Sequence, residues 1–141
     1  MAATVTTFGS DNRAIERDPI ELVWEVNGGL VALTNDDSTL RALPNGTVFL
    51  SAEIACIQAE AGATSSKLDL RVGGGSLLAG ASDNGGTLSV LNSGIAAGTF
   101  TPTASGGTTG DVNLNARVNI VGTPSTAPIW RVRVLCLRTS F

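Results

Sequence analysis

The chain is built from short runs in which apolar and polar residues alternate. In the clearest run, residues 129–138, every second side chain is apolar and the intervening positions include Arg131 and Arg133. Side chains of a strand point alternately to its two faces, so this run predicts a strand with one face in a core and a polar back. Residues 111–121 alternate in the same way, with Arg117 and three asparagines on the polar side. The short connection between the two runs predicts an antiparallel pair.

Three further segments alternate. Residues 20–26 direct Ile20, Leu22, Trp24 and Val26 inward, and Asn27 with two following glycines predicts a hairpin to the apolar residues 30–33. Residues 47–57 also fit a strand, although Ser51 as a cap before an apolar run fits a short helix. The strand is favoured because residues 67–72 alternate strictly, and a hairpin through residues 61–66 would pair the two segments. The expected inward positions of this strand are Val48, Leu50, Ala52, Ile54 and Cys56.

Residues 73–110 are rich in glycine, serine, threonine and alanine, with short apolar pieces between them. This composition predicts short strands between loops, with residues 82–86 and 105–110 as loop tips. The glycines at 73–75 follow a strand as a phosphate loop would, but the lysine and helix of such a loop are missing. Eight or more short strands separated by turns predict an all-β fold, an antiparallel two-sheet sandwich of the jelly-roll type.

Residues 1–19 differ from the rest because they have no apolar period around the single Phe8. We expect an extended N-terminal arm at 1–19 and one β-sandwich domain at 20–141, a length that suits a single core. For such an arm to be ordered, it needs a surface to lie on, either its own domain or a neighbouring subunit.

Composition excludes several kinds of partner. Charged residues make up 15% of the chain and the net charge is −3, which argues against nucleic-acid binding because that depends on clustered lysine and arginine. No run is long enough to cross a bilayer, and the first residues do not resemble a secretory signal, so we expect no membrane partner and synthesis without Sec export.

The cysteines, Cys56 and Cys136, are too few for a zinc site. Both fall on apolar phases, which predicts buried free thiols. The alternative is a disulfide across the two sheets, which requires Cα atoms within about 7 Å. The pair Asp36 and Asp37 lacks the spaced ligands of a calcium loop and predicts a solvated turn.

Catalytic chemistry finds little support. The chain has no histidine, so Ser-His-Asp and Cys-His arrangements cannot form. Only six aromatic residues and no tyrosine are present, and Trp24 and Trp130 fall on core phases. We therefore expect a protein that is not an enzyme and has no metal or cofactor.

A polar sheet face is the more interesting feature. If residues 111–121 and 129–138 pair, Arg117, Arg131 and Arg133 share a face with Asn113, Asn115 and Asn119. Such a face is either solvated or a subunit interface, where arginine is enriched. The positive mean hydropathy of +0.24 favours apolar surface covered by partners.

The arm, the run of short strands with small-residue loops, the absence of histidine and the terminal segment WRVRVLCLRTSF together resemble the cement or decoration proteins of tailed-phage heads. The resemblance implies a homotrimer, made in the host cytoplasm and seated on the outer surface of the virion. There it would bind and stabilise the major capsid protein lattice, with the arm reaching across that lattice. Phe8, Arg13 and Arg17 are then the expected lattice contacts of the arm.

Two alternatives remain. A fibre-head or adhesin module would bind a host glycan through the glycine-rich loop tips, and an exposed Trp24 or Trp130 beside Asp83 and Asn84 would favour it. A tail or neck structural protein shares the chemistry of a cement protein and is not separated from it by sequence.

Overall fold

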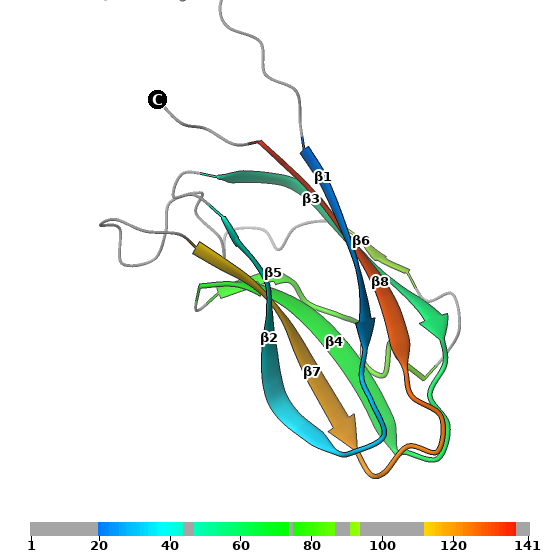
Figure 1. The fold of residues 1–141 in the computed structure, drawn as a ribbon. Helices are drawn as coiled ribbons and strands as arrows, with labels where there is room; N and C mark the ends of the chain where they lie inside the picture. The colour runs from blue at the N-terminus through cyan, green and yellow to red at the C-terminus, as the bar shows by residue number, and fades with distance from the viewer. Residues whose placement is uncertain (1–19, 44–46, 74, 87–90, 94–111, 138–141) are drawn as a thin grey trace, which may run out of the picture.

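Strands make up the regular structure of the computed structural model, which describes residues 20–43, 47–73, 75–86, 91–93 and 112–137 (Figure 1). The strands are β1 (Ile20–Asn27), β2 (Leu33–Leu43), β3 (Val48–Gln58), β4 (Ser65–Val72), β5 (Gly75–Leu78), β6 (Leu91–Ser93), β7 (Val112–Val121) and β8 (Ile129–Leu137). The alternative of a helix at residues 51–61 is wrong, because this segment lies mostly in β3.

The strands form two four-stranded antiparallel sheets. Sheet I has the order β1-β8-β3-β6, and sheet II has the order β2-β7-β4-β5. Except for β4 and β5, consecutive strands lie in opposite sheets, and the last strand of sheet I, β8, is inserted between β1 and β3 (Figure 1). This order, with two Greek keys wrapped into a sandwich, is that of a jelly roll, so the predicted fold class is confirmed.

The core lies between the sheets and follows the predicted alternation. The inward side chains of β8 (Trp130, Val132, Val134 and Cys136) have no exposed surface. From sheet II, β4 and β7 contribute Leu68, Leu70, Leu114 and Ala116, which are also fully buried. Complete burial of a leucine or valine is worth about 1.5–3 kcal/mol each, so these three central strands contribute much of the stability of the fold.

Three predicted pairings are wrong. The sequence predicted that β7 pairs with β8, β1 with β2, and β3 with β4. In each case the two strands lie in different sheets. Each connection crosses from one layer of the sandwich to the other instead of closing a hairpin. Alternation shows which face of a strand is buried, and this face is the same whether the next strand lies beside it or across the core.

One predicted phase also changes within β3. The pairing of β3 with β8 slips between Phe49 and Ser51, which is the sign of a β-bulge. An extra residue reverses the faces of a strand, so Phe49 is buried and Leu50 is 45% exposed, opposite to the expectation for Leu50.

The two cysteines are buried free thiols, as expected. A disulfide across the sheets is ruled out by the topology, since both thiols belong to sheet I. Cys56 lies opposite Trp130 of β8, and Cys136 is six residues further along that strand. At about 3.3 Å per residue the two thiols are roughly 20 Å apart.

Candidate functional site

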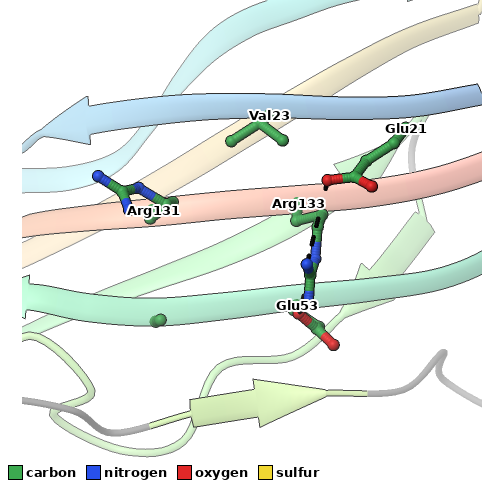
Figure 2. A pocket seen from close by; sticks show the side chains of 6 residues that line it. Glu21, Val23, Glu53, Arg131 and Arg133 are labelled. Carbon is green, nitrogen blue, oxygen red and sulfur yellow. Dashed lines mark hydrogen bonds and ion pairs between the residues drawn. The ribbon is translucent and has the colours of Figure 1, made fainter.

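Arg133 forms the centre of a charged cluster on the outer face of sheet I. It projects from β8 between Val23 of β1 and Glu53 of β3 in the register. Its Nε donates to Oε2 of Glu53 (2.9 Å), its Nη2 donates to the same oxygen, and its Nη1 lies 4.0 Å from Oε1 of Glu21 (Figure 2). The hydrogen bonds and charge of Glu53 raise the pKa of Arg133, so its guanidinium stays charged. Through Glu53 and Glu21, this one side chain of β8 links β8 to β3 and to β1.

Arg131 occupies the neighbouring outward position of β8 but is held less firmly. Its Nη2 lies 3.9 Å from Oε2 of Glu25, and both side chains are more than half exposed. Exposed pairs of this length contribute little to stability. The guanidinium of Arg131 therefore keeps donors that a partner protein can use.

These charges border a shallow depression of about 320 Å³, lined by Glu21, Val23, Glu53, Ala55, Arg131 and Arg133 (Figure 2). Ala55 lies opposite Arg131 in the register, and its short side chain leaves the space open. Val23 is 52% exposed at the rim. The depression offers apolar surface beside donors and acceptors of both charges, which suits the binding of a protein side chain.

The outer face of sheet II carries an ion pair with two hydrogen bonds, between Arg117 and Asp37. Nε and Nη2 of Arg117 on β7 each donate to a carboxylate oxygen of Asp37 on β2, both at 2.8 Å. The hydrogen bond from Arg117 is the main cause that lowers the pKa of Asp37, and the same bond raises the pKa of Arg117. This bidentate geometry uses the planar fork of the arginine within the sheet.

The arginines expected to share one face are divided. Arg131 and Arg133 lie on the outer face of sheet I, whereas Arg117 lies on the outer face of sheet II with Asn113, Asn115 and Asn119. The expectation of a single polar surface is wrong because β7 and β8 do not pair. The arm residues Phe8, Arg13 and Arg17 lie outside the described residues.

The sequence did not indicate the acidic partners of Arg131 and Arg133, nor the depression between them. Glu53 and Ala55 become neighbours of Arg133 and Arg131 only because β8 inserts beside β3. The alternation of each strand shows that these side chains point outward, but it carries no signal for the pairing.

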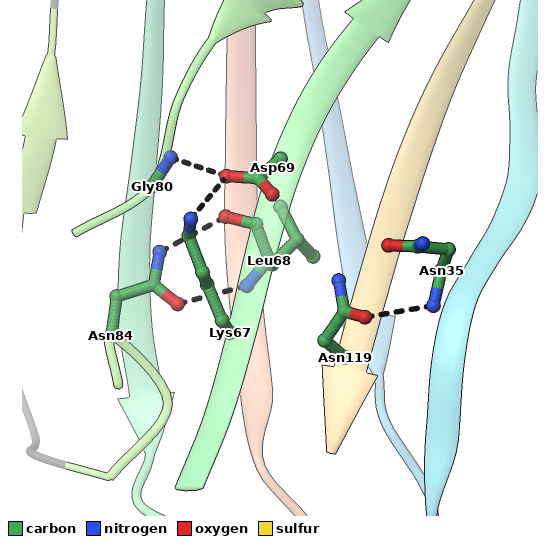
Figure 3. A network of polar contacts seen from close by, with 7 residues as sticks. All are labelled: Asn35, Lys67, Leu68, Asp69, Gly80, Asn84 and Asn119. Atoms are coloured by element: carbon green, nitrogen blue, oxygen red, sulfur yellow. Dashed lines mark hydrogen bonds and ion pairs between the residues drawn. The ribbon is translucent and has the colours of Figure 1, made fainter. Parts of the chain in front are cut away.

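The segment 82–86, predicted to be a loop tip, forms a turn that is held closely against the sandwich. Asn84 is 1% exposed; its Oδ1 accepts from the backbone N–H of Leu68 (2.9 Å) and its Nδ2 donates to the carbonyl of Leu68 (3.0 Å) (Figure 3). Nε1 of Trp130 donates to the carbonyl of Asn84 (3.3 Å). The loop itself is confirmed, but the sequence did not indicate that the Asn84 side chain takes the place of a strand partner at the edge of β4.

Apolar surface is present on both the strands and the connections. The exposed large apolar side chains of the described residues are Val23, Leu30, Val31, Leu50, Ile57 and Val121. Val23 and Ile57 both project from the outer face of sheet I, which makes that face less polar than the sequence alone indicates.

A search of the described residues finds no group of three or more potential metal ligands among histidine, cysteine, aspartate and glutamate. In the same residues no helix has the length and apolar character needed to span a membrane.

No protein-family model matches the chain, and no curated protein matches its sequence. Two solved structures contain a chain of similar fold. One belongs to the capsid asymmetric unit of cyanophage Pam1, with a TM-score of 0.50 and 20% identity over 96% of this chain and 91% of that one. The other belongs to the capsid of Ralstonia phage GP4, with a TM-score of 0.51 and 15% identity over 97% and 93%. The likeness shows a common fold that extends over nearly the whole of chains of similar length.

Proposed function

We propose that this chain is a non-enzymatic structural protein of a virus particle, a capsid decoration or cement protein that binds and stabilises the major capsid protein lattice from the outside. The observation that carries the proposal is the match over almost the full length to chains of two phage capsid structures. Fold alone does not determine function, so the proposal also needs a surface that suits contact with a capsid.

The outer face of sheet I is the best candidate for the contact with the lattice. It combines the depression, the weakly paired Arg131, and the exposed Val23 and Ile57. On the other outer face, Arg117 is already engaged by Asp37 through two hydrogen bonds. Arg131 can donate hydrogen bonds to an acidic or carbonyl group of the capsid, because its contact with Glu25 is long. Such bonds, once shielded from water, would strengthen binding.

The proposed assembly is a homotrimer on the capsid, with Arg13 and Arg17 of the arm contributing basic contacts to the lattice. Neither nucleic acid nor membrane is part of this proposal. Removing residues 1–18 is expected to weaken binding to particles, and unaltered binding would remove the arm from the interface.

The glycan-binding alternative loses one of its two tryptophans. Trp130 has no exposed surface and is hydrogen-bonded to Asn84, so it cannot act as a sugar platform. Trp24 faces inward and packs partly buried against the core. No observation on the described residues favours this function over a capsid role.

The direct test is whether purified particles of the virus that encodes the chain contain it, and whether particles lacking it bind the purified protein. Stoichiometric, saturable binding with greater resistance of the particles to heat is the expected result. Absence of the chain from intact particles would overturn the proposal.

Arg131→Ala tests the proposed contact face. If this side chain is a binding hot spot, its truncation costs more than about 1 kcal/mol, which is roughly a fivefold or greater loss of affinity for particles. Arg41→Ala, an exposed arginine on β2, is the matched control and is expected to bind normally. Equal affinities of the two variants would exclude this face.

A further inference from the structure

The four sheet edges of the described residues differ in how they are protected. In sheet II, β2 is long but has two register shifts and a residue with positive φ, Asn35. The remaining edges β5 and β6 have only four and three residues. In contrast, β1 pairs with β8 through all eight residues without a shift, and its other side has no strand partner among the described residues. Bulges and short strands protect edges, so β1 is the edge open to another strand.

The inner side of β1 is also incompletely covered. Its apolar row of Ile20, Leu22, Trp24 and Val26 packs against the core but stays partly exposed. Apolar residues on the edge strand β5 of sheet II are well covered, with Leu77 at 0% and Leu78 at 7% exposure. A further strand beside β1 would therefore complete both its hydrogen bonding and the burial of Trp24.

The charges on β1 argue against a second β1 as that strand. In an antiparallel pair centred on Val23, Glu21 of each copy would lie opposite Glu25 of the other. Like charges directly opposite one another destabilise a sheet. In that register a second β1 is disfavoured, and a strand without acidic side chains fits the edge better.

The arm of this chain has that character. Residues 1–10 contain no charged side chain, and residues 4–8 read Thr-Val-Thr-Thr-Phe, types that favour strands. The 19 residues before Ile20 span at most about 63–68 Å when extended, whereas the edge of β1 is about 26 Å long. Pro19 favours extended backbone at Asp18, which disfavours a tight reversal of the chain directly before β1.

We propose that residues 3–8 of one copy add to the β1 edge of a second copy as a fifth strand of sheet I. Each copy then donates an arm on one side and accepts one on the other, a head-to-tail contact that forms a ring where the rotation between copies closes and an open chain of copies where it does not. The inference deepens the proposed function. It rests on that function in one respect, the expectation that copies of the chain meet on the particle.

Disulfide trapping tests the pairing in the purified full chain. Val23→Cys is combined with a cysteine placed in turn at each position from 3 to 8, and Val121→Cys replaces Val23→Cys in the control series. Facing positions of neighbouring strands have Cβ atoms about 4.5–5.5 Å apart, within reach of a disulfide. The native Cys56 and Cys136 are buried and do not compete. Val121 is similarly exposed but lies on sheet II.

The expected result is a ladder of covalently linked oligomers, strongest at alternate arm positions and absent from the Val121→Cys series. Crosslinks confined within one chain would show that each arm covers its own edge and would overturn the proposal. No crosslink at any position, or equal linking in both series, would also overturn it.

A second measurement separates this inference from the proposed function. Val5→Asp with Thr7→Asp puts acidic side chains into the added strand, beside an edge that already carries Glu21 and Glu25. The variant is expected to lose the oligomer in light scattering and to expose Trp24 to acrylamide, while Ser10→Asp with Asn12→Asp leaves both unchanged. An oligomer that survives the first pair of changes would overturn the arm exchange but leave particle binding open. Failure to bind particles, with the exchange intact, would overturn only the function.

Discussion

Arg117 and Arg133 have corresponding places in the two sheets. Each projects outward from a strand with neighbours on both sides, and each pairs with a carboxylate on the next strand. These pairs add to the register that the buried faces already specify across β2 and β7, and across β3 and β8. The backbone alone specifies that register less strongly.

Asp37→Asn tests the pair on sheet II through its pH dependence. The pKa of Asp37 is lowered below its usual 3.8, so the pair stabilises the fold above that value, and the stabilisation is lost as pH falls through the lowered pKa. The variant is expected to be slightly less stable than the parent at neutral pH, with the difference vanishing in strong acid. Denaturant titrations at several pH values measure it, and a gap that persists in strong acid would contradict the assignment.

The thiols give a second residue-scale prediction. Burial raises the pKa of Cys56, whose Sγ lies 3.4 Å from the carbonyl oxygen of Gln58, and the thiolate is the reactive form. A disulfide-exchange reagent is expected to modify the native protein slowly at neutral pH and to titrate both cysteines after unfolding. A thiol count of zero in the unfolded, unreduced chain would show a disulfide instead.

At the scale of the element, the two faces of β7 differ in what they contribute. Leu114→Ala is expected to lower the free energy of unfolding by about 2–5 kcal/mol because the leucine is fully buried. Val121→Ala on the same strand, 57% exposed, is expected to change it by less than about 0.5 kcal/mol. Denaturant midpoints at constant slope measure both values. Similar losses would mean that the inward face of β7 is wrongly assigned.

The sequence predicts strands more reliably than it predicts partners. Alternation located β1, β4, β7 and β8 and their inward residues, because burial of one face is a local pattern. It failed for Leu50, where a bulge reverses the phase. Composition predicted the loop at residues 82–86 but not the burial of Asn84, which bonds to a strand edge sixteen residues away. Neither the bulge nor these bonds leave a periodic signal.

At the scale of the molecule, the same limit applies to the candidate site. Its arginines were identified from the sequence, but their grouping required the pairing of strands that are far apart in the chain. The fold class was predictable because many short amphipathic strands have few ways to bury one face each. Which strands become neighbours depends on how the whole chain wraps.

The place of β8 has a consequence for synthesis on the ribosome. The first strand of sheet I to be made is β1, and its only strand partner in the described part of the chain is β8, the last to be made. Translation therefore leaves β1 without this partner until nearly all of the described chain has emerged. Glu21 and Glu25 stand where gatekeeper residues are found, because like charges on neighbouring β1 strands oppose their pairing while that edge is uncovered.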